Sequence, residues 1–551
     1  MSPKTSSLSS SKRPLQWIIR GNLVIPTTNP FRPSNDAAAA ADDDDDDDVL
    51  WLGPGLKILL NHVLTVDSLG IIQTIEPARV YDARVSNNND NDDDDATDKA
   101  TILTLSKYEF LCPGLIDLHI HAPQYSYSGT ATDRPLMGDD GWLETYTFPS
   151  ERRLRDNPEL TNQVYRKVVK TTLRHGTTTA VYFATLDLQP CRQLVDICHQ
   201  QGQRALVGKV CMDRNAPLDY QQSTQQNLQE TKSLLEYIQQ QTQRNAKTRP
   251  SPLVLPLITP RFIPTCTPAL LQGLGQLAKE HNCHITSHLS ESYDEVAFTR
   301  HLDQTTDWNT WHTLQQSLSS SSSSSNTCPT YVPRTDAEIF DTYDLLSDRC
   351  IMAHSVHLTN NDWTLLRKRG TGIAHCPLSN FCFAGQSFQA RWALTQNNKV
   401  GLGTDIAGGY HPSMWHSSRM AVVASQALQH QRLTQTKPLE NSSEEKSPKE
   451  NDPIIDYRHA FYMATLGGAV ALGMDDKIGT LRVGMEFDAL VVSTEHRVST
   501  KDSTATSSQY QPIDIFEGLD SLSDVFQKLC VLGDDRNIKR VFVQGRDVTV
   551  R

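Results

Sequence analysis

Short apolar runs alternate with longer amphipathic stretches over much of the chain, from Pro113 to about Gly473. The longer stretches, such as NQVYRKVVKTTLRHG at 162–176, carry apolar residues at helical spacing and end at a glycine suited to a C-cap. The short runs have the length and composition of strands. Eight of them can be counted, at 115–121, 177–185, 204–213, 252–262, 283–291, 350–358, 372–380 and 399–407. Their alternation with helices predicts a parallel α/β fold.

Eight successive strand–helix units favour a (β/α)8 TIM barrel over residues 113–475, and an open doubly wound sheet remains the alternative because strand boundaries are uncertain. The flanking segments, 16–112 and 476–551, show short strands with glycine turns. Strands from the two ends of a chain can pair in one sheet, so we expect a small composite β-sandwich domain beside the barrel. Residues 1–15 are expected to form a disordered tail.

Low-complexity insertions interrupt this pattern. The acidic runs at 42–48 and 92–95, the serine run at 319–325 and the charged stretch at 438–452 cannot pack a core and are expected to be surface loops. The Gln-rich stretch at 220–242 is different, because it keeps Leu, Tyr and Ile at helical spacing and therefore predicts an ordinary barrel helix.

Charge and cysteine content argue against a nucleic-acid-binding, secreted or membrane-anchored protein. The 551 residues include 52 basic and 64 acidic side chains, a formal net charge of −12, and much of the acidic excess lies in the two aspartate runs. The near-neutral remainder argues against binding to nucleic acid. Eleven cysteines occur without a CxxC pair, and no apolar stretch is long enough for a signal peptide or membrane span. A reduced, cytosolic protein without a membrane anchor is expected.

Candidate metal ligands stand at the ends of several predicted strands. His119 and His121 lie two residues apart, so both imidazoles project from one face of the first strand. An isolated HxH is more often two polar residues of an edge strand. However, His288, His354 and Asp405 also fall at or near strand ends, which form the active face of a TIM barrel. Together these residues predict a nitrogen and oxygen site for a divalent transition metal.

The order of these motifs resembles the amidohydrolase superfamily. HxH is followed by HLSE, containing His288 and Glu291, then by AHS and GTD. The resemblance implies a deformed TIM barrel and a metal-activated water. Members with two metals usually bridge them with a lysine on strand four, but PLVLPLITPRF at 252–262 has no lysine. We therefore expect a single metal ion.

A closer resemblance, to the guanine deaminase family, runs through most of residues 113–475. It is carried by HIHAPQYSYSGTATDRPLM, WLETYTFPSE, RHGTTTAVYFAT, GQRALVGKVCMDRN, ITPRFIPTC, CHITSHLSES, IAHCPLSNF and GLGTDIAGGYHPSMW. It implies one divalent metal ion per subunit, expected to be Zn²⁺, and a homodimer. The implied metal contacts are His119, His121, His288 and Asp405, with His354 as a fifth ligand or a hydrogen-bond partner of the bound water.

The same resemblance implies a substrate pocket lined by Gln124, Arg261 and Phe262. An amide offers a donor and an acceptor to ring nitrogens, a guanidinium can meet a carbonyl oxygen, and an aromatic face can stack on a base. Guanine would be the substrate, with xanthine and ammonia as products of purine catabolism. Glu291 would move a proton from water to N3 of the ring, and Asp405 would move the second proton to the departing amine, with His354 assisting.

Two alternatives stay open. Another amidohydrolase could deaminate or dechlorinate a different heterocycle, such as a cytosine, adenine or triazine, because the fold alone does not fix the substrate. The chain could also be a non-catalytic scaffold of the same fold, although such a protein would be expected to have lost metal ligands or the acid/base residue.

Overall fold

A computed structural model describes residues 13–31, 48–88, 100–130, 133–137, 140–245, 247–302, 333–435, 452–497, 509–510 and 512–550. Apart from their last residues, Asp48 and Asp452, the acidic run at 42–48 and the charged stretch at 438–452 lie outside these residues. The run at 92–95, the serine run at 319–325 and most of the tail at 1–15 also lie outside them. The loop and tail predictions for these segments stay predictions.

Eight parallel strands form the central sheet, and each pairs with the next one along the chain. They are β7 (Leu115–His121), β8 (Thr177–Phe183), β9 (Arg204–Cys211), β10 (Val254–Pro260), β11 (His284–Leu289), β12 (Cys350–His354), β13 (Gly372–His375) and β14 (Lys399–Leu402). Every predicted strand is thus present. The strictly sequential order confirms the TIM barrel and excludes the doubly wound alternative, whose strand order reverses part-way.

The barrel closes where β7 meets the segment that follows β14. The backbone N–H of Asp405 donates to the carbonyl of His119 (2.8 Å), and the N–H of His121 donates to the carbonyl of Ile406 (3.0 Å). The buried carboxylate of Asp117 accepts from the backbone N–H (3.0 Å) and hydroxyl (2.6 Å) of Thr404. This seam joins the first and last strands of the barrel at their carboxyl ends.

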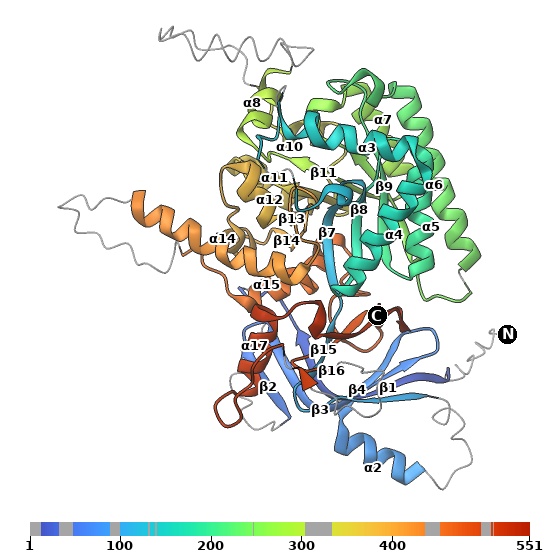
Figure 1. The fold of residues 1–551 in the computed structure, drawn as a ribbon, viewed down its shortest axis with the longest axis vertical. Helices are drawn as coiled ribbons and strands as arrows, with labels where there is room; N and C mark the ends of the chain where they lie inside the picture. Colours follow the sequence, from blue (N-terminus) through green and yellow to red (C-terminus); the bar gives the residue numbers. More distant parts are fainter. Residues whose placement is uncertain are drawn as a thin grey trace, which may run out of the picture.

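Helices cover the outside of the barrel, and one short helix, Pro377–Ser379, lies at its mouth (Figure 1). They are α3 (Phe148–Asp156), α4 (Pro158–Arg174), α5 (Leu188–Gln201), α6 (Thr224–Asn245), α7 (Pro268–His281), α8 (Tyr293–His301), α10 (Asp336–Thr342), α11 (Asn360–Arg369), α12 (Pro377–Ser379), α13 (Ala390–Thr395), α14 (Met414–Gln435), α15 (Tyr457–Ala464) and α16 (Leu466–Leu472). Helix α6 includes most of the Gln-rich stretch and buries Leu234, Leu235 and Ile238, as its spacing predicted. No helix in the described part of the chain has both the length and the apolar character needed to cross a membrane.

Several strands are shorter than predicted at their carboxyl ends. The runs predicted to reach 358, 380 and 407 leave strand conformation after His354, His375 and Leu402. Apolar composition could not reveal these ends, because most residues beyond them are also buried, and two of them, Ser379 and Asp405, line a cavity at the mouth of the barrel.

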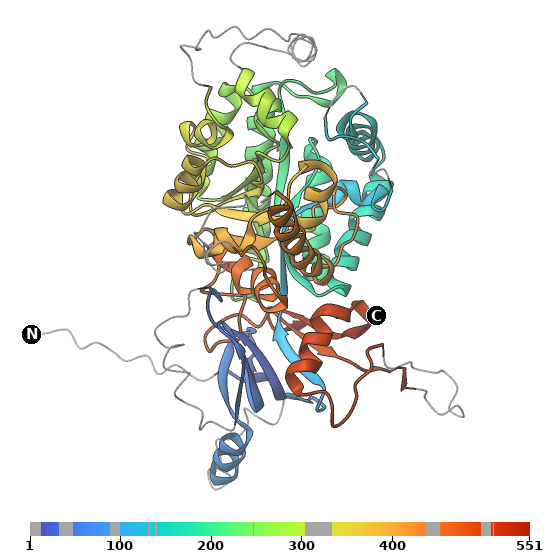
Figure 2. The same cartoon turned by 90° about the vertical axis from the view of Figure 1, so that its left-hand side faces the viewer.

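The accessory domain combines both ends of the chain, as expected. Its strands share one nine-stranded sheet that lies below the barrel in Figures 1 and 2. They are β1 (Leu15–Pro26), β2 (Val49–Gly53), β3 (Leu56–Asp67), β4 (Ile72–Pro77), β5 (Thr101–Thr104), β6 (Glu109–Pro113), β15 (Ala489–Ser493), β18 (Ile538–Val543) and β19 (Arg546–Asp547). Strands β6 and β15 join the two halves in antiparallel register.

Helix α2 (Ala78–Asn88) follows β4, and the C-terminal segment adds α17 (Leu522–Leu532) and the short pair β16 (His496–Arg497) and β17 (Gln509–Tyr510). Helix α17 begins at a capping box in which the Ser521 side chain accepts from the backbone of Asp524. It packs against α14 and α15, so the C-terminal segment also touches the barrel.

A buried ion-pair network links the barrel to the accessory sheet. Arg204, at the start of β9, is fully buried and donates to Asp488 (2.9 and 3.0 Å) and to Glu486 (2.8 Å). Gln544 adds a donor to Glu486 (3.0 Å), and its backbone N–H binds Asp488 (2.7 Å). Arg204 thus supplies the positive charge with which both buried carboxylates are paired.

We expect Arg204→Met to destabilise the protein by about 3–5 kcal/mol, because it leaves two buried carboxylates without their cation. Urea unfolding followed by tryptophan fluorescence measures the change. The control is Arg369→Met, which removes an ion pair between Arg369 and Asp341 whose arginine is 43% exposed. Equal effects of the two substitutions would show that the network does not hold the domains together.

Candidate active site

Four side chains converge at the carboxyl ends of the barrel strands. The Nε2 atom of His121 lies 3.2 Å from Nε2 of His119 and 3.1 Å from Nε2 of His288. The Oδ1 atom of Asp405 lies 3.1 Å from Nε2 of His119 and 3.3 Å from Nε2 of His121. All four residues are at most 8% exposed. Strands β7 and β11 and the seam after β14 thus bring their donor atoms to one point.

The histidine tautomers follow from their other contacts. Nδ1 of His288 faces the carbonyl of Arg261 (2.6 Å), which can only accept, so Nδ1 carries the hydrogen and Nε2 presents its lone pair to the cluster. His354 is arranged in the same way, because its Nδ1 donates to Oδ1 of Asn380 (3.0 Å). Its Nε2 lies 3.5 Å from Glu291 and 3.8 Å from Asp405.

This donor set fits a metal ion. Two nitrogen ligands at about 2.0–2.1 Å from one tetrahedral Zn²⁺ lie about 3.3 Å apart, close to the separations seen here. The Nε2 lone pairs of His288 and His354 and the carboxylate of Asp405 face this point and would attract a cation. Ligand atoms of His119, His288, His354 and Asp405 also all lie within 4.8 Å of one another. The outward Nδ1 contacts of His288 and His354 hold the rings as metal ligands are commonly held.

Burial sets the protonation states of these groups. Loss of hydration lowers the pKa of His121 to about 4 and lowers that of His288 well below its ordinary value. Burial alone would raise the pKa of Asp405, but hydrogen bonds to His119 and His121 hold it well below the ordinary range. Neutral imidazoles and an ionised carboxylate are the forms that bind a metal.

Glu291 differs from Asp405 in its environment. Burial, and then the charge of Asp405, raise the pKa of Glu291 well above its ordinary value. Its carboxylate lines the same cavity and lies beside Nε2 of His354. A carboxyl group with a raised pKa next to a metal cluster is suited to accept and return a proton.

Unusual backbone conformations aim several of these side chains. His354, Ser355 and Asp405 have φ of 63°, 54° and 49°, and Ser290 has 48°. Residues other than glycine seldom adopt this left-handed region, and such positions are concentrated at functional sites. Here they coincide with the points where β11, β12 and β14 give way to the mouth of the barrel.

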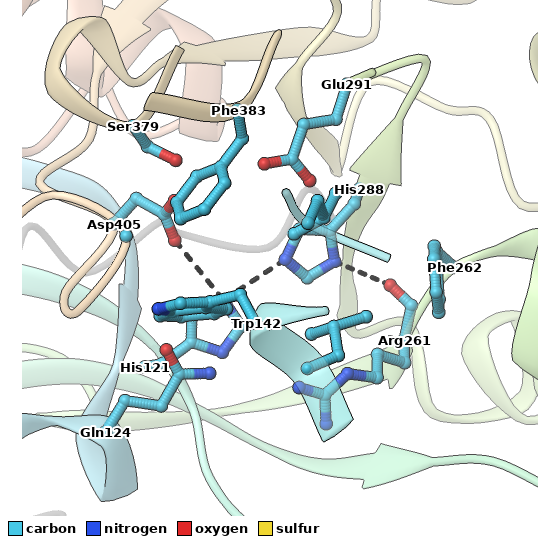
Figure 3. Close-up of a pocket in the computed structure, with 13 residues that line it drawn as sticks. His121, Gln124, Trp142, Arg261, Phe262, His288, Glu291, Ser379, Phe383 and Asp405 are labelled. Carbon is cyan, nitrogen blue, oxygen red and sulfur yellow. Dashed lines mark hydrogen bonds and ion pairs between the residues drawn. The ribbon is translucent and has the colours of Figure 1, made fainter. Parts of the chain in front are cut away.

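A cavity opens beside the cluster. Its lining includes His121, Gln124, Leu136, Trp142, Arg261, Phe262, His288, Glu291, Phe383 and Asp405 (Figure 3). In Figure 3, Glu291 lies on one side of the cavity, and Gln124 and Arg261 lie on the opposite side. The structure therefore brings all the predicted site residues to one place, with His119 and His354 behind the lining.

Several residues of the site were given no role by the sequence analysis, although Trp142, Glu151 and Asn380 lie within the motifs WLETYTFPSE and IAHCPLSNF. Trp142 and Phe383 cover the cavity with ring centroids 5.2 Å apart, but single aromatic residues in loops and short helices predict nothing specific. Asn380, which orients His354, follows a strand that was predicted to continue through it. Glu151 resembled an ordinary acidic residue in the first turn of a helix, and only the fold places it beside Gln124 and Arg261.

The profile of the Amidohydrolase family matches residues 110–548. The chain belongs to this family. Among relatives in the family, guanine deaminase of Homo sapiens is 36% identical over 503 residues, covering 90% of this chain and 94% of that protein. Guanine deaminase of Dictyostelium discoideum is 34% identical over 495 residues, with the same coverage of 90% and 94%.

Solved structures of proteins named guanine deaminase are also similar to this chain in fold. The guanine deaminase of C. acetobutylicum with guanine bound in its active site has a TM-score of 0.69 and 26% identity, covering 97% of this chain and 99% of that one. E. coli guanine deaminase has a TM-score of 0.70 and 26% identity, covering 98% and 100%. Both comparisons span the barrel and the accessory sheet together.

We expect purified protein to carry about one divalent metal ion per chain and His119→Ala/His121→Ala to lose it, because half of the converging donor atoms disappear. Elemental analysis after gel filtration measures the ratio. His430→Ala, which alters an exposed histidine on α14, is the control and should retain the metal. Retention of metal by the double variant would refute this ligand set.

Proposed function

We propose that the protein hydrolyses guanine to xanthine and ammonia. The observation that carries this proposal is one cavity in which a metal-ligand cluster, a carboxyl group with a raised pKa and purine-complementary side chains face one another. Relatives named guanine deaminase, at 34–36% identity over 90% of the chain, support the same substrate.

The metal ligands and Glu291 have separate roles in the first half of the reaction, the attack of water on C2. We propose that His119, His121, His288 and Asp405 hold one divalent ion, which when bound lowers the pKa of a coordinated water from 15.7 to about 7. Glu291 takes the proton released as the water oxygen bonds to C2, and delivers it to N3 of the ring. Protonation of N3 lets the ring accept the electron pair of the attacked C=N bond.

Asp405 and His354 serve the second half of the reaction. With Oδ1 directed at His119 and His121, Asp405 leaves Oδ2 toward His354, where it can orient the attacking oxygen and pass its remaining proton to the amino group. The C2–N bond then breaks, ammonia leaves and the C2 carbonyl forms. Because Asn380 occupies Nδ1 of His354, its Nε2 is free to accept a hydrogen bond from the water or to serve as a fifth ligand.

Gln124, Arg261 and Phe262 are proposed to hold the base. Gln124 and Arg261 are each at most 3% exposed, so their donors and acceptors cannot be satisfied by bulk water and favour a polar ring. Phe262 and Trp142 offer aromatic faces to its planar surface. This lining favours guanine over an apolar substrate, and it distinguishes the proposal from a scaffold without activity.

The first experiment is to offer guanine, adenine, cytosine and a simple triazine to the metal-loaded protein and to measure ammonia release. Selective release from guanine that a chelator abolishes would support the proposal. Turnover of another ring alone would retain the metal site and refute the roles of Gln124 and Arg261. If nothing reacts although metal is bound, the scaffold alternative is favoured.

We expect Glu291→Gln to keep its metal and to lose about 10²–10⁴-fold in kcat, because the amide cannot transfer the proton. Steady-state kinetics with guanine and elemental analysis measure the two properties together. Glu236→Gln on the exposed face of α6 is the matched control and should retain wild-type activity. Full activity of Glu291→Gln would exclude this residue as the general base.

We further propose that the bound ion is Zn²⁺ and that the protein acts in purine catabolism in the cytosol. A set of imidazole nitrogens and one carboxylate oxygen suits Zn²⁺, although iron shares this preference. The described cysteines are all free thiols, which is consistent with a reducing compartment.

We also propose a homodimer. Apolar residues on α14, α17 and the segment before α15 are exposed around a largely apolar cavity, among them Val423 (49%), Ile454 (36%) and Val531 (42%). An exposed apolar surface of this kind often marks a protein interface. We expect Val423→Asp to shift the sedimentation coefficient from dimer to monomer, while Val483→Asp, at a valine that is 54% exposed and does not line this cavity, should not. A dimer that survives Val423→Asp would exclude this surface.

A further inference from the structure

Glu151 is a fully buried carboxylate at which the polar contacts of the substrate side of the cavity meet. Its Oε2 atom accepts from the hydroxyl of Tyr220 (2.6 Å) and from Nη1 of Arg261 (3.1 Å). Its Oε1 atom accepts from Nη2 of Arg261 (3.4 Å) and from Nε2 of Gln124 (3.3 Å). The donors come from separate parts of the chain, so tertiary structure alone assembles this contact.

The contact with Glu151 fixes how Gln124 presents its amide. Oε1 of Gln124 accepts from the backbone N–H of Ala407 (3.1 Å), while its Nε2 donates to Glu151. Ala407 can only donate and Glu151 accepts, so the amide cannot flip without losing both bonds. One hydrogen on Nε2 and one lone pair on Oε1 remain for a ligand. Gln124 therefore meets a substrate with a defined donor and a defined acceptor.

Glu151 also determines the charge of the cavity. Arg261 is 3% exposed and rests against the ring of Phe148 (5.1 Å), so bulk water does not screen its charge. Burial alone would lower the pKa of Arg261, but the charge and hydrogen bonds of Glu151 raise it. The carboxylate of Asp405 lies among the proposed metal ligands at the other side of the cavity. An Arg261 paired with Glu151 therefore adds no net positive charge to the cavity.

We propose that Glu151 is a positioning and specificity residue, which by neutralising Arg261 and fixing Gln124 makes the cavity bind neutral purine bases and disfavour anionic ones. This inference rests on the proposed function. It also bears on product release, because xanthine is more acidic than guanine and loses a proton more readily. Without Glu151, an unpaired guanidinium in a water-poor cavity would retain the xanthine anion.

The test compares ligands of different charge on the metal-loaded protein. Dissociation constants are measured by calorimetry for hypoxanthine and for xanthine at mildly alkaline pH, where hypoxanthine is largely neutral and xanthine largely an anion. Neither ligand has an amino group to lose, so binding is measured without turnover. The informative quantity is the ratio of the two constants, since general loosening of the cavity weakens both ligands.

In Glu151→Gln we expect this ratio to move in favour of xanthine by about tenfold or more, the size associated with one hydrogen bond to a charged group. The KM for guanine should rise at the same time. Tyr220→Phe removes one donor to Glu151 but keeps its charge, and should leave the ratio unchanged. Glu159→Gln, at an exposed position of α4, is the matched control for loss of one carboxylate.

A ratio within twofold of wild type in folded Glu151→Gln would overturn the proposal, and so would an equal shift in Tyr220→Phe. If Glu151→Gln does not fold, Glu151→Gln/Arg261→Met is compared with Arg261→Met. Arg261→Met leaves the buried Glu151 anion alone and should weaken xanthine more than hypoxanthine, and the double variant should restore the ratio. Failure of that restoration would also overturn the proposal.

The ligand measurements separate this inference from the proposed function. If wild-type protein does not deaminate guanine, the proposed function fails, while the ratio of dissociation constants still decides whether Glu151 sets the charge preference. If guanine is deaminated and the ratio does not change, only the role of Glu151 is lost.

Discussion

Closure of the barrel between β7 and the segment after β14 is the constraint on which the site depends. The same two backbone hydrogen bonds that close the seam, from Asp405 to His119 and from His121 to Ile406, hold three of the converging donor residues. Asp117 reinforces the seam through Thr404 from within β7. Metal-ligand geometry is thus a consequence of strand closure, and displacement of either edge would separate the histidines from the carboxylate.

Exclusion of bulk water from the site sets the protonation states of its imidazoles and carboxyl groups. In a buried site, imidazoles remain neutral, one carboxylate is held ionised by its partners, and another has a raised pKa. Asp405 and Glu291 are chemically similar groups in one cavity, and their different neighbours prepare them for different tasks. In the same surroundings of low polarity, an unpaired Arg261 would raise the free energy of the folded protein. Its partner Glu151 therefore matters for folding as well as for binding.

The accessory sheet supports this arrangement from the opposite end of the barrel. Arg204 stands at the amino end of β9 and joins two carboxylates of the C-terminal segment. Strand β6 runs directly into β7 and pairs with β15, so the strand carrying His119 and His121 is anchored in the accessory sheet before it enters the barrel. Both ends of the chain are therefore needed to fix the position of the first barrel strand.

The sequence by itself determined the eight strands and the ligand candidates, because apolar runs alternate with amphipathic helices and histidines stand at strand ends. The order of the strands in the sheet, which separates a barrel from a doubly wound sheet, was decided by the tertiary structure. The sequence also determined the composite accessory sheet, whose strand pattern appears at both termini. It could not determine where β12, β13 and β14 end, since the residues beyond them are as buried as the strands. Nor could it assign roles to Glu151, Asn380 or Trp142, because these roles arise from contacts between segments far apart in the chain. Tertiary structure alone decided these, because a side chain's charge partner and orientation depend on which neighbours packing brings to it.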